Sequence, residues 1–237
     1  MLNEVQPGVF WFHPPSGSEV YLVHTQEGLV LIDAGFPVSA PALAEALRDG
    51  GFDPADVRLA IATHQHGDHV AGLAWWHQEY GVPVLAHAED AEAIVQGDPL
   101  KTCGLFPYLS SAVESYPCPV ARHLVDGDEV TLGERTLTII HAPGHTPGCI
   151  LIRVGDALIT GDVVAESGAL GWMDVHWGSN PMDYAKTLDA MHAFTSLLAC
   201  PGHGAPFTLS DRQLVSARDH VAFYLSWEHG FPAYPRR

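Results

Sequence analysis

The residues best suited to chemistry lie in one short run, THQHGDH at positions 63–69, which has the pattern H-x-H-x-D-H. The run directly follows a predicted strand, whose alternating side chains aim His64 and His66 in similar directions. A predicted helix begins directly after it, so that Asp68 and His69 face the same point from another side. Imidazole and carboxylate groups are ligands of zinc and similar metals. The run therefore predicts a site for two adjacent metal ions.

Three later segments also place a polar side chain at the end of a predicted strand. They carry His145 within APGHTPG, Asp162 within TGD and His203 within PGHG. The flanking glycines let the backbone turn sharply and approach other groups closely. Each segment is commonplace alone, but together they complete a set of seven candidate ligands: His64, His66, Asp68, His69, His145, Asp162 and His203.

Strands and helices alternate along the chain in an order that places helices on a sheet. The predicted strands are 9–13, 20–24, 29–33, 58–62, 82–86, 129–132, 136–141, 149–154, 157–160 and 197–200. Helices are predicted from Ser39, whose side chain would cap the first turn, to the glycines at 50–51, and over 68–80, 88–95, 181–194 and 210–227. Because no linker separates these elements, we expect one domain over residues 1–237, built from two similar halves.

Residues 97–120 interrupt the alternation of strands and helices, and they are rich in proline and aromatic residues. Proline disfavours the interior of both helices and strands, so the segment is expected to be irregular. It is predicted to form either a lid or pocket wall over the site or an ordinary surface connection.

The composition excludes several classes of protein. The chain has 237 residues, of which 47% are hydrophobic, and no repeat period, which excludes a disordered or collagen-like chain. A net charge of −17 disfavours nucleic acids and anionic membranes as partners, and bound divalent cations would offset part of it. The four cysteines form no C-x-x-C pair, and we find no signal peptide and no apolar run of about 20 residues. We therefore expect reduced thiols and a cytoplasmic location.

With these motifs the sequence resembles the metallo-β-lactamase-fold hydrolase superfamily. The resemblance lies in five ordered pieces: LIDAG at 31–35, THQHGDH at 63–69, GHTPG at 144–148, TGD at 160–162 and PGHG at 201–204. It implies an α/β fold, a four-layer αββα sandwich of two mixed β-sheets flanked by helices, with metals at one edge of the sheets. The alternation of predicted strands and helices agrees with two halves of that kind.

The resemblance also implies a role for each candidate ligand. One metal would be held by His64, His66 and His145, the other by Asp68, His69 and His203, and both by the bridging Asp162. Asp33 would support the site from behind by orienting an imidazole. We expect two divalent ions per chain, with zinc as the first choice and iron or manganese as alternatives.

The expected mechanism needs no protein nucleophile. Two metals roughly 3.5–4 Å apart can share a water and lower its pKa to near neutrality. We expect the bridging hydroxide to attack a carbonyl, and Asp68 to act as both ligand and catalytic acid–base group. The sequence lacks the nucleophile motif G-x-S-x-G, which agrees with this reading.

Differences from particular branches of the family limit the classes of substrate to be expected. The β-lactamases themselves lack an aspartate at the position of Asp162, and the diiron electron-transfer branch has glutamate in place of His66. Nuclease branches carry additional nucleic-acid-binding parts. The remaining group resembles glyoxalase II thioesterases, lactonases and related hydrolases. Because Lys101 and Lys186 are the only lysines, we favour a neutral lactone, ester or thioester over an anionic substrate.

Substrate contacts would come from outside the metal motifs. Trp172, His176, Trp177 and Tyr184 follow the bridging aspartate in the chain and are predicted to line an apolar pocket. Packing against helices is the alternative role for the tryptophans. His87 ends a predicted strand on what would be the same rim.

Two other functions remain open. Persulfide dioxygenases resemble this fold but bind one iron through two histidines and one aspartate, here His64, His145 and Asp162. Those enzymes carry a GRTDF-like segment after the aspartate, where this chain has VVAESGALGWMD. A non-catalytic metal-binding or regulatory protein is the third alternative. For the hydrolase we expect a small-molecule substrate, no nucleic acid and no membrane, and a homodimer is left open.

Overall fold

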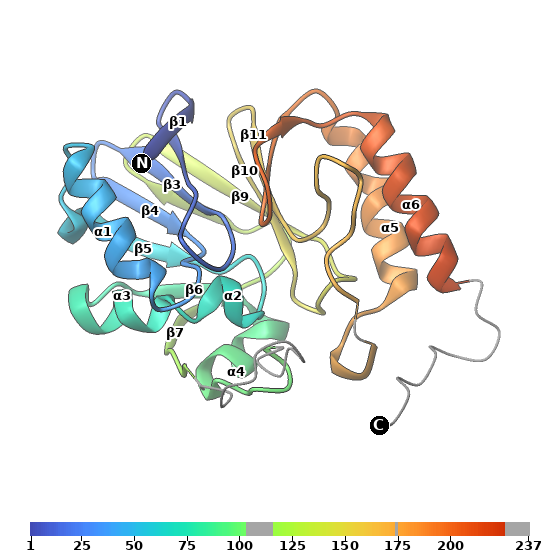
Figure 1. The fold of residues 1–237 in the computed structure, drawn as a ribbon, viewed down its shortest axis with the longest axis horizontal. Helices are drawn as coiled ribbons and strands as arrows, with labels where there is room; N and C mark the ends of the chain where they lie inside the picture. The colour runs from blue at the N-terminus through green and yellow to red at the C-terminus, as the bar shows by residue number, and fades with distance from the viewer. Residues whose placement is uncertain (103–115, 174, 226–237) are drawn as a thin grey trace.

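Two β-sheets pack face to face, with helices on both outer sides, in the computed structural model of the chain (Figure 1). The structure describes residues 1–102, 116–173 and 175–225. Helices α1 and α3 lie on one side of the sheets, and α5 and α6 lie on the other (Figure 1). The predicted four-layer αββα sandwich is confirmed.

The first sheet has seven strands in chain order, of which the first four form an antiparallel meander and the last four run parallel. Parallel neighbours need crossover connections, which here contain helices. The strands are β1 (Leu2–Gln6), β2 (Val9–Phe12), β3 (Val20–Thr25), β4 (Gly28–Ile32), β5 (Val57–Ile61), β6 (Val84–His87) and β7 (Val120–Leu124). The helices are α1 (Ser39–Asp49), α2 (Gly67–Val70), α3 (Leu73–Tyr80) and α4 (Ala88–Gln96), with a 3₁₀ turn, η1, at Pro54–Asp56.

The second sheet has six strands in the order β13-β12-β11-β10-β9-β8, in which only β11 and β12 are parallel neighbours. Its strands are β8 (Glu129–Leu132), β9 (Arg135–His141), β10 (Ile150–Val154), β11 (Ala157–Gly161), β12 (Leu198–Pro201) and β13 (Phe207–Thr208). The helices are α5 (Pro181–Met191) and α6 (Asp211–Leu225), with 3₁₀ turns η2 (Val175–Trp177) and η3 (His192–Phe194).

Alternation along the strands divides the core into three layers. In β4, Val30 and Ile32 join the cluster between the two sheets, while Leu29 and Leu31 join the cluster under the helices of the first half. In β10, Ile152 likewise faces the other sheet and Leu151 faces the cluster beneath α5 and α6. Strands buried on both faces read as continuous apolar runs, which explains the LVLI pattern before the first aspartate motif.

Two predicted helix features are wrong in detail. The helix predicted over 68–80 is broken into α2 and α3, because Gly72 N–H donates to the carbonyl of Gly35 and the carbonyl of Asp68 accepts from Ser18 N–H, both at 2.9 Å. Ser39 does not cap α1, whose N-cap residue is Val38; its hydroxyl donates instead to the carbonyl of Ser16. The first departure ties the loop after β4 to the segment that follows the metal motif, and the second ties the start of α1 to the loop between β2 and β3.

Three strands escaped the sequence analysis, and all are short or lie at a sheet edge. β1 and β7 close the two ends of the first sheet, and β13 closes one end of the second. Edge strands leave one side open to solvent and carry polar residues, as in LNEVQ and VARHL, so the alternating apolar signal is faint.

Most of the segment predicted as a lid or connection, residues 103–115, lies outside the described residues, as does Cys103. At one end of the segment the carbonyl of Thr102 accepts a hydrogen bond of 2.8 Å from Gly67 N–H, and at the other Cys118 is buried in the core. The remaining cysteines, Cys118, Cys149 and Cys200, are buried free thiols, as predicted. Within the described ranges no helix has both the length and the apolar character needed to cross a membrane.

Candidate metal centre

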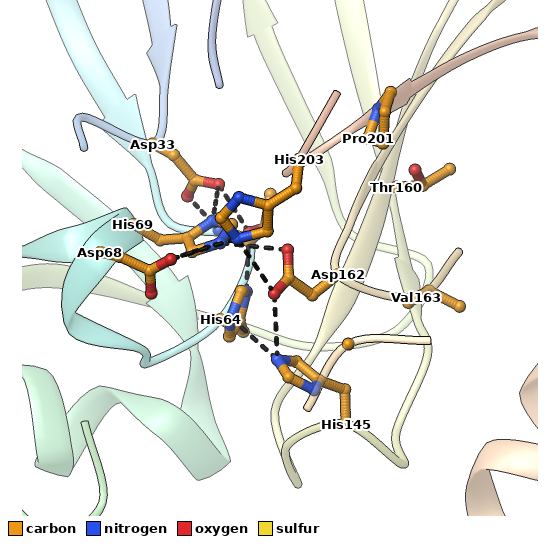
Figure 2. Close-up of polar contacts among 12 residues, drawn as sticks. Asp33, His64, Asp68, His69, His145, Thr160, Asp162, Val163, Pro201 and His203 are labelled. Atoms are coloured by element: carbon orange, nitrogen blue, oxygen red, sulfur yellow. Dashed lines mark hydrogen bonds and ion pairs between the residues drawn. The ribbon is translucent and has the colours of Figure 1, made fainter. Parts of the chain in front are cut away.

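The seven candidate ligands meet at one edge of both sheets. The loop after β5 and the first residues of α2 carry the 63–69 motif, and the loops after β9, β11 and β12 carry His145, Asp162 and His203. Figure 2 shows six of them converging from the two halves of the molecule: His64, Asp68, His69, His145, Asp162 and His203. The convergence that the sequence analysis predicted from separate strand ends is therefore present in the structure.

Six of the ligands form two groups of three, and a third set, His64, His69 and Asp162, overlaps both groups. The ligand atoms of His64, His66 and His145 all lie within 4.8 Å of one another, and Nε2 of His64 is 3.2 Å from Nε2 of His145. Those of Asp68, His69 and His203 form the second group, in which Nε2 of His203 lies 3.1 Å from Oδ2 of Asp68. These are the two triads that the family resemblance implies.

Asp162 lies between the groups (Figure 2). Its Oδ1 is 3.1 Å from Nε2 of His69, and its Oδ2 is 3.5 Å from Nε2 of both His145 and His203. One carboxylate therefore faces a histidine of the first triad and two of the second, which is the position that a bridging ligand requires.

The chemistry of the donor set fits divalent metals. Nε2 of His69 and Oδ1 of Asp162 are buried and face each other at 3.1 Å without hydrogen-bond geometry, and neither makes a hydrogen bond to another group in the described part of the chain. A buried polar atom without a partner costs about 1–3 kcal/mol. Nitrogen donors from imidazole and oxygen donors from carboxylates, gathered this closely, suit zinc, iron or manganese. Bound metals would give these atoms the partners they lack.

Burial keeps the first triad in its metal-binding form. It lowers the pKa of His66 to about 3 and holds the pKa of His64 well below its usual value, with neighbouring histidines adding to the effect. Burial also lowers the pKa of His145. Neutral imidazole is the form that ligates metal, so these three side chains need lose no proton when a metal binds near neutral pH.

The second triad is charged. Hydrogen bonds that His203 donates to the carboxylates of Asp162 and Asp68 raise its pKa to about 10. Although burial raises the pKa of the Asp162 carboxyl, His69 and His203 hold it well below its usual range. Protonated His203 therefore neutralises carboxylates in the metal-free chain, and a metal at this triad would have to displace that proton.

Asp33 lies behind the site, as expected, and orients one ligand. Its Oδ2 accepts a hydrogen bond of 2.7 Å from Nδ1–H of His69, which turns Nε2 of that ring toward Asp162. Its two oxygens also accept from the backbone N–H and the hydroxyl of Thr63, at 2.8 and 2.7 Å. Asp33 has a φ of 57°, a conformation that aspartate tolerates better than most residues.

Thr63 is a positioning residue that the sequence analysis did not single out. Its hydroxyl donates to Asp33, so its oxygen accepts from Nδ1–H of His64 at 3.0 Å. That tautomer leaves the Nε2 lone pair of His64 facing the centre. The signal was its place directly before the first histidine, at the strand end.

Asp90 was missed as well, and it joins the two loops of the first triad. It is fully buried; its Oδ2 accepts from the backbone N–H of Gln65 at 2.9 Å and from the hydroxyl of Thr146 at 2.7 Å. Its Oδ1 accepts from the backbone N–H of Gly148 at 2.7 Å. In the sequence it looks like an ordinary acidic residue in the first turn of a helix, so only the fold reveals this role.

Glycines let the chain pass close to the ligands. A Cβ at Gly171 would lie 2.7 Å from both Cβ of Asp162 and Cε1 of His145. A Cβ at Gly202 would collide with Oδ1 of Asp162 and Cε1 of His69. Positions 171 and 202 therefore require glycine. The sequence analysis had singled out residues beside them, Trp172 and His203, but not the glycines themselves.

The predicted substrate pocket needs correction at Tyr184. This side chain is fully buried, and its hydroxyl lies 2.8 Å from the carbonyl oxygens of Asp162 and Val163, to which it donates. It therefore anchors the bridging aspartate's loop and does not line a pocket. Trp172 and Trp177 are 48% and 40% exposed, and their role stays a prediction. The side chain of His176 lies outside the described residues.

His87 packs away from the seven ligands. Its ring stacks on that of His141 with centroids 4.1 Å apart, and its Nδ1 accepts from the backbone N–H of Glu89 at 3.3 Å. Burial lowers its pKa. The ring therefore caps the start of α4 and packs on the last residue of β9. It lies at the end of its strand, as expected, but it belongs to neither group of ligands.

Known proteins are similar to this chain in sequence and in fold. The family model described as the metallo-beta-lactamase superfamily matches residues 13–203. The chain is 32% identical over 214 residues to acyl-coenzyme A thioesterase MBLAC2 of Bos taurus, covering 78% of this chain and 72% of that protein. It is 31% identical over 215 residues to the human protein of the same name, covering 78% and 72%.

Solved structures with this fold include two metallo-beta-lactamases. The lactamase GOB-18 from Elizabethkingia meningoseptica superposes with a TM-score of 0.72 at 19% identity, covering 91% of this chain and 87% of that one. The subclass B3 lactamase BJP-1 from Bradyrhizobium japonicum gives 0.69 at 25% identity, covering 91% and 88%. Because the family model matches residues 13–203, most of the chain, the chain belongs to the metallo-beta-lactamase superfamily.

Proposed function

We propose that this protein is a hydrolase that binds two divalent metal ions and cleaves a small ester, lactone or thioester, with a thioester as the leading candidate. The observation that carries the proposal is Asp162, whose carboxylate lies between two triads of metal-binding side chains. The thioester preference draws support from relatives about 30% identical that are named acyl-coenzyme A thioesterases.

Each ligand has an assigned role in this proposal. His64, His66 and His145 would hold one ion, and Asp68, His69 and His203 the other, with Asp162 shared. When bound, such a pair of ions supplies an activated water and polarises the carbonyl of the substrate. Asp33 and Thr63 keep the rings of His69 and His64 turned toward the centre.

Asp68 is the group that we assign to proton transfer. Its side chain is 26% exposed, while the His69 side chain is fully buried, so a substrate can approach Asp68. Although burial raises the pKa of Asp68, the neighbouring His69 and His203 lower it, so the carboxylate is ionised and able to accept a proton. Its Oδ2 faces His203, and we place the transferred proton on Oδ1.

The test is metal content combined with a panel of substrates. Protein purified without added metal should contain about two divalent ions per chain and hydrolyse thioesters or esters. Asp68→Asn should lower kcat by about 10²–10⁴-fold while the circular dichroism spectrum is unchanged. A neutral acyl thioester should be cleaved at least as well as the acyl-coenzyme A with the same acyl group, because the chain offers few lysines to bind an anion.

Other results would replace the proposal with one of the alternatives. One iron per chain, together with thiol-dependent oxygen uptake, would identify a persulfide dioxygenase. A metal-loaded protein that cleaves none of the esters, lactones and thioesters would favour a non-catalytic metal-binding protein. Near-normal rates for metal-loaded Asp68→Asn would remove Asp68 from the proton transfer.

A further inference from the structure

A small cavity of about 140 Å³ adjoins the candidate metal centre. It shares Asp162 and His203 with that centre. The remaining side chains that line it within the described part of the protein are aliphatic: Val164, Ala165, Ala169, Leu170 and Pro201. A space with this lining accepts an uncharged apolar group and offers little to a charged or strongly hydrogen-bonding one.

The wall of the cavity is held in place by its own hydrogen bonds. The loop after β11 folds back on itself: Gly171 N–H donates to the carbonyl of Asp162 at 2.9 Å, and Ala165 N–H donates to that of Ala169 at 3.0 Å. Tyr184 anchors the start of this loop, and Nδ1–H of His220 in α6 donates to the carbonyl of Gly168 at 3.1 Å. The cavity is therefore formed before any ligand binds, which lowers the entropic cost of binding.

The cavity opens on the accessible side of the metal centre. The side chain of His203 is 53% exposed, whereas that of Asp162 is only 9% exposed. A substrate whose reacting carbonyl lies at the ligand cluster can therefore extend past His203 into the cavity. Only a group bonded to that carbonyl lies close enough to reach it, and an ester or thioester has two such groups, the acyl chain and the leaving group. The mainly aliphatic lining suits an acyl chain better than a polar leaving group.

The volume limits the length of that chain. An apolar cavity of about 150 Å³ admits a benzene molecule, which has six carbons. We therefore propose that this cavity is the acyl-chain subsite of the enzyme and takes an unbranched aliphatic acyl group of about four to six carbons. The inference rests on the proposed hydrolase function, since it identifies the substrate class of the same site.

The test compares acyl chain lengths on one leaving group in the metal-loaded protein. Each buried methylene should raise kcat/KM about fourfold up to the size limit, so that hexanoyl thioesters exceed acetyl thioesters by at least tenfold. Octanoyl thioesters should be poorer than hexanoyl. Ala169→Leu enlarges an exposed residue of the cavity wall and should reduce the hexanoyl-to-acetyl ratio by about tenfold or more. Ala165→Leu, in the same wall, should act in the same direction if Ala169→Leu folds poorly.

A matched control is Ala121→Leu, which adds the same side chain at an exposed position in β7. It should leave the rates and the hexanoyl-to-acetyl ratio unchanged. A ratio that is near one in the natural chain, or that neither cavity variant alters, would overturn the proposal.

A binding measurement separates failure of the subsite from failure of the proposed function. Hexanoate should raise the melting temperature of the metal-loaded natural chain more than acetate does, and Ala169→Leu should abolish the difference. If no ester or thioester is cleaved but this difference is found, the proposed hydrolase function is contradicted and the proposed subsite is supported. If thioesters are cleaved but neither the hexanoyl-to-acetyl ratio nor the melting temperature depends on residue 169, the proposed subsite is contradicted and the proposed function is supported.

Discussion

His69 shows how neighbours define a single ligand in this site. Asp33 accepts from one ring nitrogen at 2.7 Å, and Asp162 faces the other at 3.1 Å. Although burial lowers the pKa of His69, Asp162 and Asp33 hold it well above its usual value. A metal at this position would replace the proton on Nε2, while the hydrogen bond to Asp33 keeps the ring aligned.

Asp33→Asn tests this orienting role. Asparagine also tolerates the left-handed backbone conformation, so the change removes mainly the negative charge behind His69. We expect metal affinity at the second triad to fall by about 10- to 100-fold, measured by competition with a zinc chelator. Asp56→Asn, which removes an exposed carboxylate paired with Arg58, is the control and should bind metal normally. Equal affinities for both variants would show that Asp33 does not orient the ligand.

Asp90 gives a prediction about pH. Burial raises its pKa to about 6, above the value of 3.8 expected in the unfolded chain. Its contribution to stability is therefore fully present below about pH 3.8 and is lost as the pH rises through about 6. In metal-free protein, the free energy of unfolding of the natural chain minus that of Asp90→Asn should fall by about 1–2 kcal/mol between pH 5 and pH 8.

Urea unfolding at the two pH values measures this difference. Glu92→Gln removes an exposed carboxylate from the same helix that is not among the groups acting on the pKa of Asp90, and it should not reproduce this fall. If the difference for Asp90→Asn instead grew as the pH rose, the pKa of Asp90 would be lowered in the fold and our account of its burial would be wrong.

At the scale of elements, the site is built by loops that leave strand ends at one edge and pass very close to each other. The loop after β12 runs against the loop after β11, where Gly202 N–H donates to the carbonyl of Gly161 at 2.7 Å. The same strand, β12, pairs in parallel with β11. The close passage requires a residue without a side chain at Gly202, beside Asp162 and His69.

Gly202→Ala should therefore displace Asp162 or His69 and weaken metal binding at the second triad, by tenfold or more as a rough expectation from disturbed ligand geometry. Gly204→Ala is the control in the same turn, because a Cβ there meets nothing within 4 Å, although its φ of +90° adds strain. We expect Gly204→Ala to lose about 1–3 kcal/mol of stability and to retain metal. Metal content after dialysis distinguishes the two, and full retention by Gly202→Ala would contradict the crowding argument.

At the scale of the whole molecule, the candidate ligands come from both halves of the sandwich. Four follow β5 in the first sheet, and the other three follow strands of the second: His145, Asp162 and His203. Apolar packing between the sheets already joins the halves. Metals held by both halves would add a second link at the edge, so metal binding and folding should be coupled.

Chelation should then lower the melting temperature. A ligand present at 100 times its Kd adds about 2.7 kcal/mol to stability, and in a chain of this length 1 kcal/mol corresponds to about 2–4 °C. We expect EDTA to lower the melting temperature by about 5–10 °C per metal site, and added zinc to restore it, measured by circular dichroism. EDTA saturated with zinc is the control and should have no effect. An unchanged melting temperature in metal-depleted protein would mean that metals do not link the halves.

The sequence alone determined the seven candidate ligands, Asp33 and the types of most elements. These are carried by local signals: ligand spacing within one motif, glycine beside a ligand, and apolar runs of strand or helix period. The tertiary structure decided what depends on contacts between distant positions. Asp90 reaches Gly148 across 58 residues, Tyr184 turns inward to hold the loop of Asp162, and the cavity wall closes against Pro201. No local pattern encodes such contacts, because burial and hydrogen-bond partners are set only when the two sheets pack together.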